Sequence, residues 1–461
     1  MEYIITLIAI GGIILFFFTK DHGSKKKPEP ELELTEEFND ILKILNETSE
    51  SVFITGKAGT GKSSLLRHFI KHTNKKYVIL APTGVAALNV GGQTIHSFFK
   101  FPPAVIHPNS IQTDYVRNGL FQNLQIVIID EVSMVRCDLM NGIDIALRKN
   151  RNKIDLPFGG IQMVFIGDLF QLPPVLMSTD RQEILSKYKS QYFFDAPVFQ
   201  NFKYHFKELT RIFRQSEGEI EFKNLLNNVR VNAVQFKDMT LLNSRHRDNA
   251  GVQENSIFLT TRKNIARNIN LEKLAALSGI EKVYTGKLSG KYEVLKTLRD
   301  EEIDEKLPAP YRLKLKKYAQ IMMLRNDPGK RWVNGSLGKV DKLEDDAIWV
   351  SILGVSYKVE LNTWREALYV FNPQTNEIEA NVSAEFEQFP IQLSYAMTIH
   401  KSQGKTFDNI TVDIGTGAFA HGQIYVALSR CTSLSGIVLN NQINNSDIIV
   451  DPKVVEFYKA N

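Results

Sequence analysis

The segment that most constrains the fold is GKAGTGKSS, which begins at Gly56. It fits the spacing G-x-x-x-x-G-K-[ST], with the strand-like run VFIT before it and the helical pattern SLLRHFIKH after it. Glycines at these positions let backbone N–H groups wrap a phosphate, and the following helix adds its positive dipole end. The segment therefore predicts an α/β fold in which this loop follows a strand of a parallel sheet.

The loop predicts a nucleotide site for ATP and Mg²⁺. Lys62 would reach the β- and γ-phosphates, and the Ser63 hydroxyl would ligate Mg²⁺. We expect nucleotide contacts from every residue of the loop: Gly56, Lys57, Ala58, Gly59, Thr60, Gly61, Lys62, Ser63 and Ser64.

An acidic pair ends the apolar run LQIVIIDE further along the chain. We expect Asp130 to hold Mg²⁺ and Glu131 to polarise the attacking water. A solvated strand end is the alternative interpretation of such a pair. The apolar strand before it and the phosphate loop upstream favour the catalytic interpretation.

A second Gly-Lys-Thr occurs late in the chain, within SYAMTIHKSQGKTF. A phosphate loop needs a glycine five positions before Gly404, and that position holds Ile399. A helix should also follow, whereas FDNITVDIG is typical of a strand. The sequence therefore predicts one phosphate loop.

Three further polar residues are candidates for contacts with the γ-phosphate. Gln171 follows a strand in GDLFQLPPV, where an amide can sense this group. Arg214 in LTRIFRQ and Arg430 in YVALSR lie far from the loop in the sequence. Positive charge delivered from another domain can be worth about 10³–10⁵ in rate. Surface salt bridges are the alternative role for both arginines.

The chain alternates strand-like and helical runs, except between about residues 285 and 380, where glycine turns and alternating apolar residues predict an antiparallel β unit. Two cysteines exclude a disulfide framework, and a net charge of +5 suits a nucleic-acid partner without proving one. The expected domains are a membrane-anchor helix (1–20), a charged linker (21–34), a first α/β domain (35–200), a second α/β domain (201–285 and 376–461) and a β-rich insertion (286–375).

The N-terminus is the compositional outlier. Residues 3–19 carry no charge, and lysines follow at Lys20 and at 25–27. As a helix this run would span about 25 Å, the short end of a bilayer core. It predicts a hydrophobic helix in a membrane, with the catalytic body cytoplasmic. The alternatives are a buried core helix or a misassigned start codon, in which case the protein would be soluble and cytoplasmic.

Seven motifs in order resemble those of the Pif-type family of superfamily-one DNA helicases, which are related to RecD-like enzymes. They are GKAGTGKSS, APTGVAALNVGGQTIHSFF, IIDEVSM, FGGIQMVFIGDLFQLPPV, LTRIFRQ, YAMTIHKSQGKTF and YVALSR, between about residues 35 and 435. The resemblance implies two RecA-like P-loop NTPase domains with ATP between them, and a small β-barrel in the second. It also implies Mg²⁺-dependent 5′→3′ translocation and unwinding, in DNA repair, recombination or replication.

The same resemblance implies roles for individual residues. The hydrolytic set would be Lys62, Ser63, Asp130, Glu131, Gln171, Arg214 and Arg430. Contacts with single-stranded DNA at a fork would come from Thr83, His96, His400, Lys401 and Ser402, and the link from DNA to nucleotide from Gln403 and Gly404. One departure concerns Phe38, which stands where the family often has an adenine-reading glutamine.

Two other functions stay open at this point. One is a single-strand-stimulated ATPase that translocates without separating duplexes. The other is a membrane-bound scaffold with a vestigial ATPase, which the intact Lys62, Glu131, Arg214 and Arg430 argue against.

Overall fold

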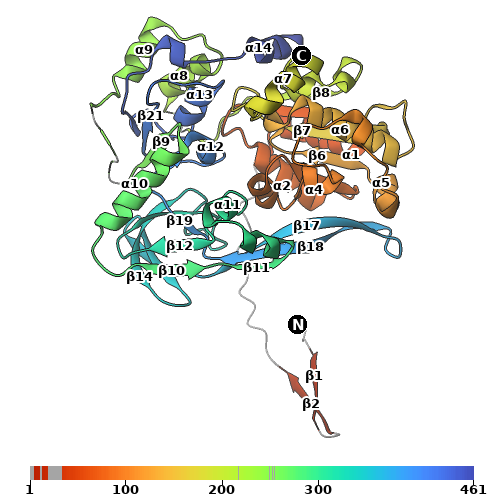
Figure 1. The fold of residues 1–461 in the computed structure, drawn as a ribbon, viewed down its shortest axis with the longest axis horizontal. Helices are drawn as coiled ribbons and strands as arrows, with labels where there is room; N and C mark the ends of the chain where they lie inside the picture. The colour runs from red at the N-terminus through yellow and green to blue at the C-terminus, as the bar shows by residue number, and fades with distance from the viewer. Residues whose placement is uncertain are drawn as a thin grey trace.

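The computed structural model describes two α/β units that lie side by side, with a β-rich insertion beneath both (Figure 1). The described residues are 5–10, 13–18, 34–215, 218–248, 250–251, 253 and 255–461.

The first unit is built on six parallel strands in the order β5-β4-β6-β7-β3-β8. Three central strands are buried along their whole length, which explains why their sequences are continuous apolar runs. Its strands are β3 (Val52–Gly56), β4 (Tyr77–Ala81), β5 (Gln93–Thr94), β6 (Ile126–Ile129), β7 (Gln162–Ile166) and β8 (His205–Leu209). Its helices are α1 (Glu36–Glu47), α2 (Lys62–His72), α3 (Gly84–Val90), α4 (Ile95–Phe99), α5 (Asn118–Asn123), α6 (Cys137–Asn150) and α7 (Ser178–Lys187).

The second unit has a smaller parallel sheet in the order β20-β9-β21-β22. The predicted parallel α/β core is thus confirmed, and β8 adds a strand to the first unit beyond the expected limit at residue 200. The strands are β9 (Ile257–Thr260), β20 (Ala396–Thr398), β21 (Ile410–Asp413) and β22 (Ile437–Leu439). The helices are α8 (Ile220–Arg230), α9 (Phe236–Asn243), α10 (Lys263–Ala276), α12 (Ile399–Ser402) and α13 (Gln423–Leu428). The C-terminal helix α14 (Pro452–Ala460) returns to the first unit, where Phe457 packs against Phe53 and Phe194 (Figure 1).

The insertion leaves the second unit after α10 and returns at β20. Its strands form three antiparallel sheets, β16-β15-β14-β13-β19, β11-β18-β17 and β10-β12, so a single closed barrel stays a prediction. They cover residues 282–393, compared with the expected 286–375. The elements are β10 (Lys282–Thr285), β11 (Lys287–Gly290), α11 (Asp300–Asp304), β12 (Arg312–Leu315), β13 (Gln320–Met323), β14 (Leu337–Leu343), β15 (Ile348–Ile352), β16 (Val355–Val359), β17 (Asn362–Asn372), β18 (Glu377–Gln388) and β19 (Ile391–Leu393).

The long β17–β18 hairpin extends from the insertion to the first unit (Figure 1). Edge strand β5 pairs with β4 only at Leu80 and Ala81, which leaves the preceding part of β4 without a neighbour on that side. The hairpin covers this edge, because the Ile79 N–H donates to the Tyr369 hydroxyl at 3.1 Å. The Lys76 ammonium also donates to the Asn376 amide oxygen at 2.9 Å.

The predicted N-terminal helix is wrong for the residues that the structure describes there. Two strands, β1 (Ile5–Ile10) and β2 (Ile13–Phe18), pair antiparallel in its place. Isoleucine and phenylalanine favour strands, and the Gly-Gly pair in the sequence between them disfavours a continuous helix. In the described part of the chain, no helix combines the length and apolar character needed to cross a membrane. The rest of the predicted anchor, and linker residues 21–33, lie outside that part.

Candidate active site

The nucleotide loop connects β3 to α2 in the first unit, and the predicted nucleotide-binding stretch Gly56–Ser64 runs from the last residue of β3 into the first turn of α2. Gly56 has φ 148°, and a Cβ on it would lie 2.7 Å from the Leu209 carbonyl oxygen. Gly59 has φ 84°, and its Cβ would lie 2.5 Å from the Arg214 Cβ. The loop spacing therefore needs glycine for backbone conformation and for space.

The Lys62 ammonium lies inside this loop. It donates to the carbonyl oxygens of Gly56 at 2.7 Å and Lys57 at 3.0 Å. Burial lowers the pKa of Lys62, and the carboxylates of Asp168 and Glu131 oppose that shift. The lysine is thus held where the loop would close around a phosphate.

The acidic pair lies at the end of β6, beside Lys62. Asp130 is only 8% exposed, and burial together with the Glu131 charge raises its pKa to about 7. Burial also raises the pKa of Glu131, although Lys62 and Arg430 act in the opposite direction. Asp130 is buried and Glu131 is half-buried, and a bound cation would stabilise the charged forms of these two neighbouring carboxylates.

The donor set fits Mg²⁺ shared with a nucleotide. Among the described residues there is no group of three or more His, Cys, Asp or Glu side chains suited to holding a metal. Mg²⁺ usually takes one or two carboxylates and completes its shell with substrate phosphates and water. Asp130 and the Ser63 hydroxyl are the side chains that would hold it.

Arg214 and Arg430 both reach this region, Arg430 fully buried and Arg214 half-buried, so neither is the exposed arginine that a surface salt bridge requires. Arg214 donates to the Ser429 carbonyl oxygen at 3.0 Å, and Arg430 donates to the Ser429 hydroxyl at 2.9 Å. Burial and the charge of Arg214 lower the pKa of Arg430 to about 9. Phosphate oxygens would compensate the charge of these two neighbouring guanidinium groups.

Gln171, predicted to sense the γ-phosphate, is in direct contact with Gln403, predicted to link the DNA to the nucleotide. Gln403, from the second unit, donates its amide N–H to the Gln171 amide oxygen of the first unit at 3.1 Å. The prediction that the late Gly-Lys-Thr is not a second phosphate loop is confirmed, because strand β21 rather than a helix follows Gly404. This segment connects the units next to the nucleotide loop.

The residues predicted to contact DNA are only partly accessible. Thr83 is exposed, although its hydroxyl oxygen already accepts the Ala86 N–H as the N-cap of α3. His96 and His400 are half-buried, and Lys401 is exposed. Ser402 is fully buried and donates to the Ile399 carbonyl oxygen at 2.7 Å, so its hydroxyl faces the protein interior.

Sequence reasoning missed a second set of polar residues behind the nucleotide loop. Asp168, Arg230, Tyr425 and Tyr458 form a hydrogen-bonded group that joins four separate segments of the chain. Only Asp168 and Tyr425 lie inside quoted motifs, at GDLF and YVALSR. Arg230 and Tyr458 carry no local signal, because their partners are far away in the sequence.

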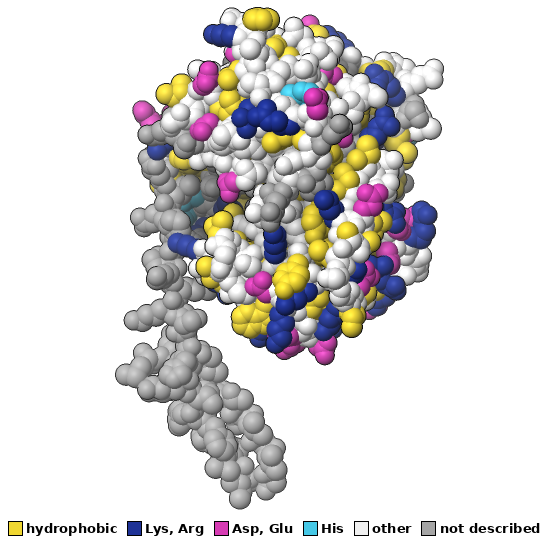
Figure 2. Space-filling view, turned by 90° about the vertical axis from the view of Figure 1, so that its left-hand side faces the viewer, with side chains coloured by type: hydrophobic (Ala, Val, Ile, Leu, Met, Phe, Trp, Pro, Cys, Tyr) yellow, Lys and Arg dark blue, Asp and Glu magenta, His cyan; other side chains and the backbone are white. Residues whose placement is uncertain are grey.

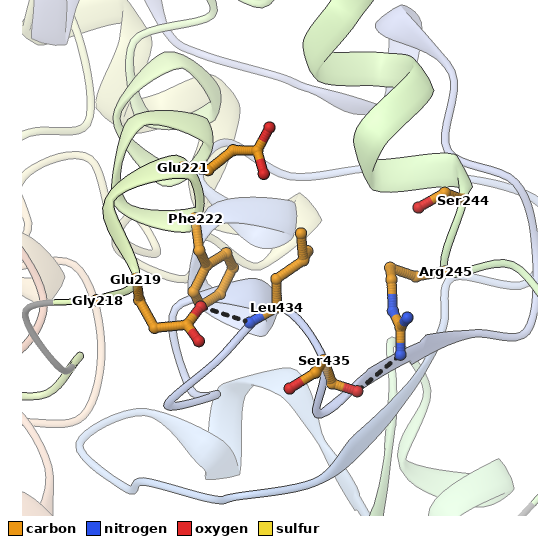
Figure 3. A pocket seen from close by; sticks show the side chains of 8 residues that line it. All are labelled: Gly218, Glu219, Glu221, Phe222, Ser244, Arg245, Leu434 and Ser435. Carbon is orange, nitrogen blue, oxygen red and sulfur yellow. Dashed lines mark hydrogen bonds between the residues drawn. The ribbon is translucent and has the colours of Figure 1, made fainter.

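Neither a pocket in the second unit nor the charge on the surface in Figure 2 marks a further ligand site. A pocket of about 360 Å³ in the second unit is lined by residues that include Glu219, Arg245 and Leu434 (Figure 3). No residue predicted to bind nucleotide or DNA lines it. Basic and acidic side chains are interspersed on the face in Figure 2, so the excess positive charge does not form a single patch there.

Known proteins with similar sequences identify the family. Residues 33–240 match the family model described as PIF1-like helicase. A protein of Bdellovibrio bacteriovorus named ATP-dependent DNA helicase Pif1 is 34% identical over 441 residues, covering 94% of this chain and 93% of that protein. The chain belongs to the Pif1-like helicase family. It is an ATP-dependent DNA helicase, and its two α/β units are RecA-like domains.

Solved structures of Pif1 from Bacteroides sp also match the helicase and distinguish two arrangements. The unliganded form and the ADP-AlF4 complex are 37% identical, cover 93% of this chain and 97% of theirs, and give a TM-score of 0.84. The form bound to ssDNA has the same identity and coverage, yet its TM-score is 0.65. Because the sequence is equally similar, the lower score reflects a different arrangement of the parts. The helicase is closer to the arrangement shared by the unliganded form and the ADP-AlF4 complex.

Proposed function

We propose that the helicase hydrolyses Mg²⁺-bound ATP between its two RecA-like domains and uses the energy to move 5′→3′ along single-stranded DNA and open forked duplexes. The observation that supports this best is the contact between Gln171 and Gln403 beside a single phosphate loop. It joins a residue predicted to sense the γ-phosphate to a segment predicted to bind DNA.

Each side chain of the site has a proposed part in hydrolysis. Lys62 binds the phosphates, and Ser63 with Asp130 holds Mg²⁺, which neutralises phosphate charge when bound. Glu131 polarises the attacking water, while Arg214 and Arg430 stabilise the charge that develops as the γ-phosphoryl group leaves.

A short path connects hydrolysis to DNA. His400 and Lys401 lie in α12, which ends at Ser402, next to Gln403. A shift of Gln403 after loss of the γ-phosphate would move α12 and change its hold on a DNA phosphate. The order of DNA, α12, Gln403 and Gln171 is therefore the proposed coupling route.

Tailed duplexes test the direction and the activity together. We expect the full chain to unwind a duplex with a 5′ single-stranded tail and to leave a 3′-tailed duplex intact, with no unwinding by Lys62→Ala. Unwinding of only the 3′-tailed substrate would refute the direction. ATP hydrolysis and movement on single strands without strand separation would support the translocase alternative, and unchanged ATP turnover in Lys62→Ala would refute the site.

We also propose that residues 3–19 attach the helicase to a membrane, without assigning a helix to them. The support is their uncharged, apolar sequence and the lysines that follow. Cell fractionation of the full chain and of a chain lacking residues 1–24 tests this. Only the full chain should be in the membrane fraction, and recovery of both in the soluble fraction would refute it.

A further inference from the structure

Arg230 is the last residue of α8, and its side chain crosses from the second domain to the first. It is 6% exposed, and one of its terminal nitrogens donates to Asp168 at 3.2 Å. The other lies 3.4 Å from the Glu208 carboxylate on β8. The contact with Asp168 is a buried ion pair between the two domains.

A third part of the chain, helix α14, fixes the position of the guanidinium. Arg230 donates to the Tyr458 hydroxyl at 3.0 Å, and Tyr458 also hydrogen bonds with Thr55, the residue before Gly56. The guanidinium carbon lies 4.3 Å from the Phe170 ring centre. Stacking on one ring while bonding to another leaves a planar guanidinium little freedom.

Asp168 is the point at which these contacts reach the active site. Its carboxylate accepts the Gln171 side-chain N–H at 3.3 Å, the Phe170 backbone N–H at 3.2 Å and the Tyr425 hydroxyl at 3.4 Å. The Tyr425 hydroxyl in turn accepts the Ala58 N–H of the phosphate loop at 3.1 Å. The orientation of Asp168 therefore affects both Gln171, the proposed sensor of the γ-phosphate, and the phosphate loop.

Stability alone is a poor explanation for the buried ion pair between Arg230 and Asp168. A buried ion pair has to offset the desolvation of both charges, and apolar residues of similar size often stabilise a protein equally well. The Arg230 Nε–H also has no hydrogen-bond acceptor among the described residues. Such unmet polar groups are uncommon in native proteins and call for an explanation.

We propose that Arg230 is a positioning residue for ATP hydrolysis: it holds Asp168 from across the domain interface and thereby orients Gln171 when the domains are together. Separation of the domains removes Arg230 from Asp168, and Gln171 loses its support. Hydrolysis is thus linked to the domain arrangement through a residue that does not contact ATP. This inference rests on the roles proposed above for Lys62 and Gln171.

The experiment measures ssDNA-stimulated ATP hydrolysis by the full chain. Arg230→Met removes the charge and keeps a long side chain, and we expect kcat to fall about 10- to 100-fold while KM for ATP changes less than about threefold. Arg230→Lys keeps the charge but lacks the planar group that stacks on Phe170 and the second terminal nitrogen that faces Glu208, so its kcat should be intermediate. Lys223→Met, on the same helix, is the control and should keep the wild-type rate.

A purely structural role predicts a different pattern. It would lower the melting temperature of Arg230→Met without changing kcat at temperatures where the protein is folded, and that result would overturn the inference. Asp168→Asn should lower kcat similarly, and the double variant Asp168→Asn/Arg230→Met should lose little more than either single variant. Fully additive losses would also overturn it.

Two further results keep the test decisive. If Arg230→Met does not fold, wild-type kcat in both Arg230→Lys and Tyr458→Phe would overturn the inference. The Lys62→Ala variant distinguishes a failure of the Arg230 inference from a failure of the proposed nucleotide site. An inactive Lys62→Ala with a fully active Arg230→Met refutes only the role of Arg230, whereas an active Lys62→Ala refutes the site itself.

Discussion

At the scale of single residues, Phe38 bears on nucleotide choice. Its ring is 1% exposed, packs against Phe213 at a centroid distance of 6.5 Å, and lies beside Gly61 of the phosphate loop. A phenyl ring has no donor or acceptor with which to read a base, and strong discrimination requires hydrogen bonds. We therefore expect kcat/KM for ATP and GTP to differ by less than about tenfold. A preference for ATP well above about 100-fold would show that another group reads the base.

Glu131 provides the second test at this scale. Glutamine has the shape of glutamate but cannot act as a carboxylate base, so Glu131→Gln should slow ATP hydrolysis by about 10²–10⁴-fold. Binding of a fluorescent ATP analogue should remain. The exposed Asp155→Asn is a matched control and should hydrolyse ATP normally. Loss of binding together with hydrolysis would contradict the proposed role.

At the scale of elements, acidic helix α11 lies against the predicted DNA-binding surface. Glu301 pairs with Arg267 at 2.5 Å, and Glu305, just after the helix, pairs with Lys263 at 2.6 Å. Burial raises the pKa of Asp304, and nearby Lys401 opposes the shift. A Cβ on Gly84, in the first domain, would lie 3.4 Å from the Lys306 carbonyl oxygen. The helix thus occupies space between segments expected to bind DNA phosphates.

Removing the negative charge of helix α11 and of the residue just after it should strengthen DNA binding. We expect Glu301→Gln/Glu305→Gln to lower the Kd for single-stranded DNA roughly three- to tenfold, measured by fluorescence anisotropy, because the freed cations become available to phosphates. The same measurement on Asp345→Asn/Asp346→Asn, which removes two charges from the turn between β14 and β15, is the control. An equal gain in both variants would indicate a net-charge effect rather than release of this surface.

Helix α14 should be pH-sensitive through His421, which is 6% exposed. Its Nδ1 accepts the Asp451 N–H at 2.8 Å just before α14, and its Nε2 lies 2.7 Å from the Leu169 carbonyl oxygen. This pattern requires a neutral ring. Burial lowers the pKa of His421, whereas the Leu169 carbonyl and nearby acidic groups act in the opposite direction.

The direction of that shift sets the expected result. Below the ordinary histidine pKa of about 6.5, the unfolded chain takes up a proton that folded His421 resists, so stability falls as the pH falls toward the lowered value. The contribution is fully present above that range and changes by at most about 1.4 kcal/mol per pH unit. Thermal melting should show the gap between wild type and His421→Gln narrowing from pH 7.5 to pH 5.5. A constant gap would contradict this.

At the scale of the whole molecule, the β17–β18 hairpin holds the first domain against the insertion. The similarity scores, 0.84 to unliganded Bacteroides Pif1 and 0.65 to its ssDNA-bound form, indicate that the parts of Bacteroides Pif1 are arranged differently in those two structures, and we expect the same difference in this helicase. Fluorophores at Lys76 and Asn376, which are in contact here, should therefore lose energy transfer when single-stranded DNA is added. Unchanged transfer at saturating DNA would show that the hairpin stays docked.

Much of the fold and site could be predicted because the signals are local. Apolar runs such as IVII predicted buried parallel strands, and the spacing from Gly56 to Ser63 predicted the loop, since nearby backbone geometry alone imposes both. The N-terminal helix was predicted wrongly because length and apolarity alone do not separate a helix from paired strands. The burial of Ser402 could not be predicted either, since it depends on packing between distant elements.

The sequence by itself determined where the phosphate loop, its acidic pair and the motif order lie, because each depends on residues close together in the chain. Only the tertiary structure decided what surrounds them. It brought Arg230 to Asp168 and Tyr458 to Thr55, and it placed α11 beside the expected DNA contacts. These contacts join residues 42 to 403 positions apart, and they form because distant elements pack together rather than through any local preference.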